Sequence, residues 1–163
     1  MGNLVLKTPA LPVTDPTSSE IIRILIDMME TMFDENGVGL AAPQVHVPLR
    51  MIVYKVPGER NGGVEIEPSV LINPVLTPMD ERMDDGIEAC LSLPGMCGIV
   101  PRFHHIHYSG LDQYGKKVEG EVKGYFARVL QHECDHLDGI LYPMRMPDLS
   151  SFGYTEEMRK GGL

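Results

Sequence analysis

Tryptophan is absent from this 163-residue sequence, and cysteine occurs only three times. No apolar run reaches the length of about 18 residues that a membrane-spanning helix needs. Positive charge is also scarce, since 14 Lys and Arg residues stand against 23 Asp and Glu residues, for a net charge of −9. Because phosphate contacts need clustered Lys and Arg, this balance argues against a dedicated binder of nucleic acid or of an anionic membrane.

We also expect no signal peptide. Its first nine residues are too short, and too broken by Lys7 and Pro9, to form the apolar segment of one. With an odd number of cysteines and no export signal, we expect reduced thiols and a cytoplasmic location. The chain length and the 43% of hydrophobic residues predict one domain, residues 1–163, with enough core to fold alone.

One segment, about residues 21–33, has the periodicity of an amphipathic helix. Its start fits two patterns: Thr17 with Glu20 as a capping box, or Asp15 with Pro16 as cap and first position. Asn36-Gly37 ends it. We expect the following apolar residues to pack in the core: Ile21, Ile22, Leu25, Ile26, Met28, Met29, Met32 and Phe33.

Between residues 49 and 122 the pattern changes to period two and to short apolar runs, which predict strands. The predicted strands are 51–54, 70–72, 87–91, 98–100, 105–111 and 118–122, separated by turns that include Asn73-Pro74 and Pro94-Gly95. A second helix is predicted at about 125–137 and ends at Gly139. The order of helix, strands and helix predicts an α+β fold, a compact single domain of short, mostly antiparallel strands around a central metal-binding helix.

The strongest chemical signal lies in this second helix, in the HExxH string of residues 132–136. His132 and His136 are four residues apart, so both imidazoles project from one helix face and can bind one ion. Glu133 is placed to take a proton from water at that ion. Unpaired histidines near an apolar helix face are costly without a partner, which favours a metal site over a chance match.

A hydrolytic metal site needs a third protein ligand and an open position. No histidine follows His136, and Tyr142 stands where one metalloprotease pattern has a third histidine, so we expect this ligand upstream. Cys134 should point away from the two imidazoles as a small buried residue. Spacing alone leaves several carboxylates and these further candidates open: Cys90, Cys97, His46, His104, His105 and His107.

Three separate strings resemble one family, peptide deformylase. Residues 37–44, GVGLAAPQ, resemble its GxGxAAxQ motif. Residues 88–92, EACLS, resemble its EGCLS motif, and residues 131–136, QHECDH, resemble its QHExDH motif. All three occur in the order of the family, and the resemblance covers nearly the whole chain. Together they are far more specific than HExxH alone.

The resemblance implies an enzyme that removes the formyl group from the N-formylmethionine of newly made polypeptides. It implies Cys90, His132 and His136 as ligands of one divalent ion, usually Fe(II), with zinc, nickel or cobalt as alternatives. A metal-bound water would attack the formyl carbon, and Glu133 would act as general base and then acid. The Gln44 side-chain amide and the Leu91 backbone N–H would hold the oxyanion.

The resemblance also assigns a substrate strand and partners. Val38, Gly39 and Ala89 are expected to contact an extended formylmethionyl peptide. Some members contact the ribosome transiently through a long C-terminal helix, whereas Pro143 and Pro147 break the short tail here. No direct partner among nucleic acids or membranes is implied.

Two residues call for separate predictions. Ala89 stands where the family usually has glycine, and a positive φ there would cost about 1 kcal/mol. Arg102 is expected to pair with Glu88 and support the Cys90 strand, with an exposed position as the competing interpretation.

Two other functions fit the same helix. A small metallopeptidase would cleave unformylated peptides, and the lack of a downstream histidine argues against it. A non-catalytic peptide-binding module would bind without turnover, and the presence of both Glu133 and Gln44 argues against that.

Overall fold

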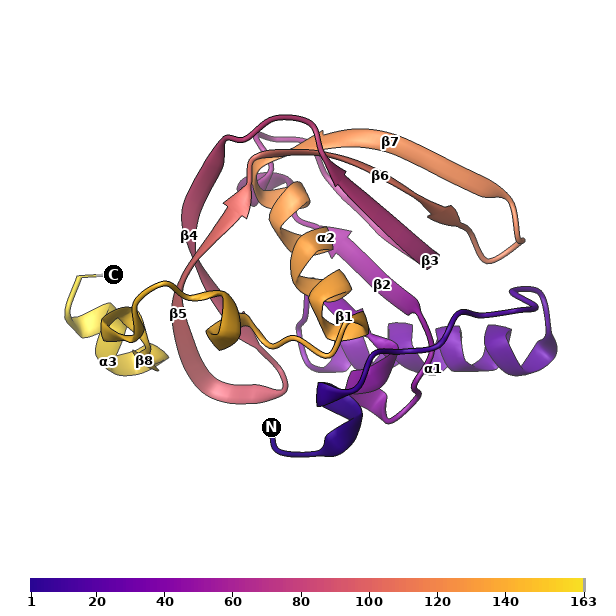
Figure 1. The fold of residues 1–163 in the computed structure, drawn as a ribbon, viewed down its shortest axis with the longest axis horizontal. Helices are drawn as coiled ribbons and strands as arrows, with labels where there is room; N and C mark the ends of the chain where they lie inside the picture. The colour runs from indigo at the N-terminus through magenta and orange to yellow at the C-terminus, as the bar shows by residue number, and fades with distance from the viewer. Residues whose placement is uncertain (163) are drawn as a thin grey trace.

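The computed structural model describes residues 1–162, and Figure 1 shows their arrangement. The helices and strands in chain order are α1 (Ser19–Asp34), β1 (Gly39–Ala41), β2 (Met51–Val56), β3 (Ile66–Pro78), β4 (Met83–Cys90), β5 (Leu93–Phe103), β6 (His105–Leu111), β7 (Lys117–Lys123), α2 (Gly124–Leu137), β8 (Gly153–Tyr154) and α3 (Thr155–Lys160). Short 3-10 turns, η1 to η5, are Leu4–Lys7, Ala42–Val45, Gly58–Arg60, Tyr142–Arg145 and Leu149–Ser151.

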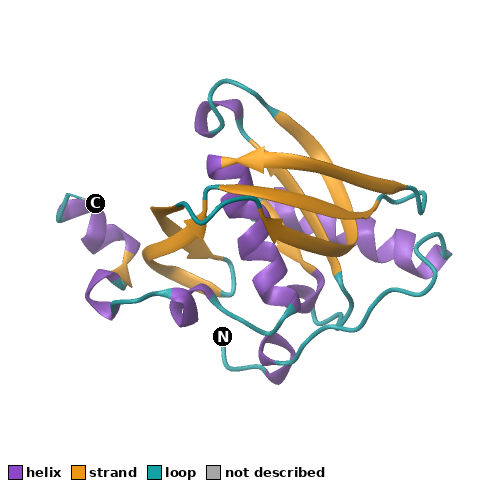
Figure 2. Ribbon diagram, turned by 45° about the horizontal axis from the view of Figure 1, so that its top comes forward, coloured by secondary structure: helices purple, strands orange, loops and turns teal. Residues whose placement is uncertain are grey.

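The strands form two antiparallel sheets, and α2 runs between them (Figures 1 and 2). The larger sheet has the order β1-β2-β3-β6-β7, and the smaller sheet has the order β4-β5-β8. The helices and sheets therefore confirm the predicted α+β fold with a central helix. No helix of the described residues is long and apolar enough to cross a membrane.

Strand β2 shows how the larger sheet is covered on both faces. Ile52 and Tyr54 pack toward α2, whereas Met51 and Val53 pack toward α1. Successive side chains of a strand point to opposite faces, so a strand covered on both sides has a continuous apolar run. Burying each of these side chains contributes roughly 1.5–3 kcal/mol.

The first helix has a different N-cap and buries a narrower face than the sequence predicted. Ser18 is the N-cap, and its side chain accepts a hydrogen bond from the Ile21 N–H, so both predicted caps were wrong. Three residues that were predicted to be in the core lie on the solvent side of the helix. The apolar face is wide, and the sequence alone does not tell which part of it contacts the sheet. These residues are Ile22, Ile26 and Phe33, at 42%, 52% and 42% exposure.

Two predicted turns were also wrong. Asn73, with a φ of 50°, lies inside β3, where the register to β6 shifts between Ile72 and Val75. Its side chain bonds the N–H and the carbonyl of Val13, which fixes the irregular backbone within the strand. Pro94-Gly95 lies inside β5. At Asn73 the pairing with a strand distant in sequence thus overrides local turn propensity.

We predict that Met28→Ala lowers the free energy of unfolding by about 2–5 kcal/mol, because the Met28 side chain is fully buried between α1 and the larger sheet. Ile26→Ala, on the exposed side of the same helix, should change it by no more than about 0.5 kcal/mol. Urea unfolding of both variants measures the difference, and equal losses would contradict the assigned helix orientation.

Candidate functional site

Cys90, His132 and His136 come together at the contact between the smaller sheet and α2. Cys90 is the last residue of β4, and the two histidines lie one turn apart on α2. One donor atom from each lies within 4.8 Å of the other two, and Cys90 Sγ is 3.2 Å from His136 Nε2. The side chains of Cys90 and His136 are buried, and that of His132 is 11% exposed.

These three donors suit a divalent cation such as iron or zinc, both of which accept thiolate and imidazole ligands. The His132 Nδ1–H donates to Glu88 Oε2 at 2.7 Å, which fixes the ring and leaves Nε2 as the atom that can bind a metal once it has lost its proton. Burial and the neighbouring His132 lower the pKa of His136 to about 3, so this imidazole is neutral, as a ligand must be. Three protein donors leave a further position for water or substrate, as in catalytic sites.

The carboxylate of Glu88 connects β4, β5 and α2. It is 5% exposed and accepts hydrogen bonds from Arg102 Nε and Nη2, both at 2.9 Å, and from Arg128 Nη1 at 2.9 Å, besides that from His132. Burial opposes the charge on Glu88, but the hydrogen bonds from Arg102 and His132 outweigh it and lower its pKa to about 2. The ionised carboxylate therefore fixes the ring of a metal-ligand candidate.

Arg102 confirms the predicted pair with Glu88, and its exposed alternative was wrong, since the residue is 5% exposed. Three further members of this network, Arg128, Asp135 and Arg145, were not predicted from the sequence. Arg102 Nη1 also bonds Asp135 Oδ2 at 2.5 Å, and Asp135 pairs in turn with Arg145. The position of Asp135 inside the QHECDH string was the one signal for its role, because the arginines lie far away in sequence.

Glu133 lies beside the cluster and lines the same cavity. Its side chain is buried, and Oε2 has no hydrogen-bond partner within the part of the chain that the structure describes. Burial raises the pKa of Glu133 to about 7, which suits a group that takes and returns a proton near neutral pH. A Cβ at Gly39 would lie 2.3 Å from Glu133 Oε1, so this glycine makes room for the carboxylate.

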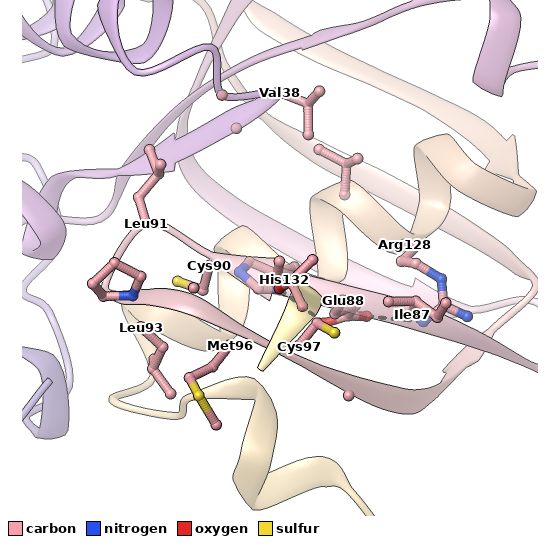
Figure 3. Close-up of a pocket in the computed structure, with 18 of the residues that line it drawn as sticks. Val38, Ile87, Glu88, Cys90, Leu91, Leu93, Met96, Cys97, Arg128 and His132 are labelled. Carbon is pink, nitrogen blue, oxygen red and sulfur yellow. Dashed lines mark hydrogen bonds and ion pairs between the residues drawn. The ribbon is translucent and has the colours of Figure 1, made fainter. Parts of the chain in front are cut away.

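Gln44 reaches the cluster from η2. Its Oε1 accepts a hydrogen bond from the Ala41 N–H at 2.8 Å, which orients the amide. Its Nε2 then faces Cys90 Sγ at 3.6 Å and Ser92 Oγ at 3.2 Å. Leu91 follows Cys90 directly and lines the same cavity (Figure 3). The two predicted oxyanion donors thus come from different segments, η2 and the residue after β4.

The cavity around these residues has a volume of about 740 Å³ and is flanked by the edge strands β1 and β4. Val38, Gly39 and Ala89, the predicted peptide contacts, all line it (Figure 3 labels Val38). Ala89 has no positive φ, because the non-glycine residues that do are Asn36, His46 and Asn73 among those described. The expected backbone strain at Ala89 is therefore absent.

The structure does not bring the other candidate ligands into the cluster. Cys134 is buried in the core between α2 and the larger sheet, as predicted, and burial raises the pKa of its thiol. Cys97 lines the cavity without joining the three donors. Three of the remaining histidines bond elsewhere: His46 with Asn3, His104 with Asp84 and His105 with Glu121. The fourth, His107, lies on β6 in register with Glu121 of β7.

Comparisons with known proteins show the family of this chain. A sequence model of the family described as polypeptide deformylase matches residues 1–152. Peptide deformylase 1 of Bordetella pertussis is 48% identical over 160 residues, which cover 96% of this chain and 90% of that protein.

Two solved structures are similar in fold. Peptide deformylase from Thermotoga maritima has a TM-score of 0.83 and 36% identity, covering 91% of this chain and 95% of that one. A class I type b peptide deformylase from Acinetobacter baumannii, bound to Met-Ala-Ser, has the same TM-score and identity, covering 90% and 94%.

We predict that Glu88→Gln weakens binding of zinc or cobalt by about 10–100-fold, because the neutral amide no longer holds the His132 ring as an ionised acceptor. Competition with a chelator measures the affinity. Glu67→Gln, at an exposed position of β3, is the matched control and should bind the metal as the unmodified chain does. Equal affinities for both variants would show that Glu88 does not orient the ligand.

Proposed function

The chain belongs to the polypeptide deformylase family, whose metal-dependent enzymes remove the N-formyl group from nascent polypeptides, and we propose which residues perform this reaction here. Residues 1–163 act as one catalytic domain. Cys90, His132 and His136 hold the metal ion, and Glu133 carries the proton. The observation that supports this assignment is the grouping of the three donor atoms within 4.8 Å, with Glu133 on the same cavity.

The proposed ion in the cell is Fe(II), and zinc, nickel or cobalt can take the same ligands, since one thiolate with two imidazoles suits each of them. When bound, the cation would act as a Lewis acid and lower the pKa of a water molecule from 15.7 toward about 7. Glu88 keeps the ring of His132 in place for that ion. Burial of Cys90 and His136 shields this side of the site from bulk water.

Glu133 moves the proton. Its carboxylate takes a proton from the attacking water, and the oxygen of that water forms a bond to the formyl carbon. When the bond between the formyl carbon and the methionine nitrogen breaks, Glu133 returns the proton to that nitrogen. The products are formate and a peptide with a free amino group. A pKa of about 7 makes both transfers feasible near neutral pH.

Gln44 and Leu91 stabilise the charge that develops on the formyl oxygen. The Gln44 Nε2–H₂ group is held toward the cluster by the bond from Ala41 to Oε1. The Leu91 backbone N–H supplies a second donor next to Cys90. Donors that are oriented before the reaction need no reorganisation as the charge forms.

The peptide lies in extended form between the edges of β1 and β4. Each edge strand offers unpaired backbone groups to an added strand, and Val38, Gly39 and Ala89 line the space between them. The Met-Ala-Ser peptide bound to the Acinetobacter baumannii relative supports a methionine-first peptide as ligand. Since the substrate is a nascent chain, we place the enzyme in the cytoplasm.

We predict that metal-loaded protein releases formate from formyl-Met-Ala-Ser under anaerobic conditions and does not cleave unformylated Met-Ala-Ser. Glu133→Ala should keep the metal and lose about 10²–10⁴-fold in turnover, because the proton carrier is gone. Cys90→Ala should lose both metal and turnover. Elemental analysis and a formate assay measure these outcomes. Absence of formate from metal-loaded protein would refute the function, and full metal retention in Cys90→Ala would refute that ligand.

Gln44→Met tests the oxyanion role separately. It removes the amide donor with little change in volume and should cost about 2.7–4 kcal/mol in kcat, with a smaller effect on KM. Ser92→Ala is the control, because it removes the other partner of Gln44 Nε2 while leaving the amide in place. A loss of the same size in Ser92→Ala would assign the effect to loop positioning instead.

A further inference from the structure

An arginine side chain forms part of the cavity wall next to the metal-ligand candidates. Arg128 lies four residues before His132 on α2, and Val129 lies four residues before Glu133, so both face the cavity one turn away. Figure 3 shows Arg128 beside Glu88 and Ile87, on the β4 side of the cavity. Its neighbours Ile87 and Val129 in this part of the lining are apolar, so the position of the charged Arg128 needs a physical reason.

The guanidinium of Arg128 is fixed by the two neighbouring strands. Nη1 donates to Glu88 Oε1 at 2.9 Å and to the Val100 carbonyl at 2.7 Å, and Nη2 donates to the Asp84 carbonyl at 2.5 Å. The side chain is only 11% exposed. With β4 and β5 both holding it, this long side chain behaves as a rigid surface.

Gly86 of β4 provides the space for this arrangement. A Cβ on Gly86 would lie 2.7 Å from both Cζ and Nη2 of Arg128, closer than real side-chain contacts allow. The guanidinium therefore rests directly on the backbone of β4. The position of this wall therefore depends on two residues: Arg128 forms its surface, and Gly86 has no side chain that would displace the guanidinium.

The reaction determines what this wall contacts. The formyl carbon must lie at the metal and Glu133, and the side chain of the first substrate residue branches from the carbon bonded to the formyl nitrogen. It therefore starts close to His132 and Glu133, and Arg128 and Val129 on α2 and Ile87 on β4 line the same cavity.

We propose that Arg128, resting on Gly86, is a specificity-determining residue that sets the size of the side chain accepted at the first substrate position. This inference rests on the proposed deformylase site. The aliphatic part of Arg128 contacts the side chain, and the fixed guanidinium limits how bulky that side chain can be. A purely structural Arg128 would instead affect all substrates alike.

Two substitutions should move this wall in opposite directions. Arg128→Ala enlarges the space and should shift the ratio of kcat/KM for formyl-Phe-Ala-Ser over formyl-Met-Ala-Ser upward by about tenfold. Gly86→Ala pushes the guanidinium off β4, toward the cavity, and should lower the same ratio. Gly86→Ala keeps both Arg128 and its ion-pair partner Glu88 in the chain, so it remains informative if Arg128→Ala folds poorly.

Arg82→Ala is the matched control, since Arg82 is an exposed arginine that pairs with Asp84 on the same strand and does not line the cavity. Its ratio should equal that of the unmodified enzyme. Equal losses on both substrates, or an unchanged ratio in Gly86→Ala, would overturn the proposal. Failure of the unmodified enzyme to release formate from formyl-Met-Ala-Ser would refute the proposed function instead, so the two failures are distinguishable.

Discussion

The buried carboxylate of Glu88 is the constraint on which the site depends. A buried charge is costly unless it is paired and hydrogen-bonded, and Glu88 satisfies this condition only when β5 and α2 are both in place. Arg102 comes from β5, and Arg128 and His132 come from α2. If any of these partners is missing, Glu88 carries a buried charge that is not fully paired. The same interaction therefore joins the smaller sheet to the helix and orients a metal-ligand candidate.

The placement of α2 between two sheets explains how a mid-chain sulfur meets the late imidazole pair. One side of the helix is fixed by the apolar core with the larger sheet, through residues such as Leu130 and Leu137. The other side presents His132, Glu133 and His136 toward β4, which ends in Cys90. Neither sheet alone would complete the donor set, and the edges of both remain free to flank a peptide.

Two glycines, Gly39 and Gly86, shape the site because they have no side chain. Gly39 leaves the space that Glu133 occupies, and Gly86 leaves the space on which Arg128 rests. In each case a methyl group would collide with a charged group next to the reacting atoms. Conformational freedom is not the reason for either glycine, because neither has a positive φ. Close approach between α2 and the two edge strands is the reason.

The sequence by itself determined the features that depend on local spacing: two helices, most of the strands, and the His132, Glu133 and His136 pattern. Its resemblance to a family named Cys90, although spacing alone could not separate it from Cys97. Only the tertiary structure decided which sulfur lies near the imidazoles, how Asn73 and Pro94-Gly95 continue strands, and which part of α1 is buried. The physical reason is that periodicity reports a residue's own element, whereas pairing between β4 and α2, or between β3 and β6, is set by contacts distant in sequence.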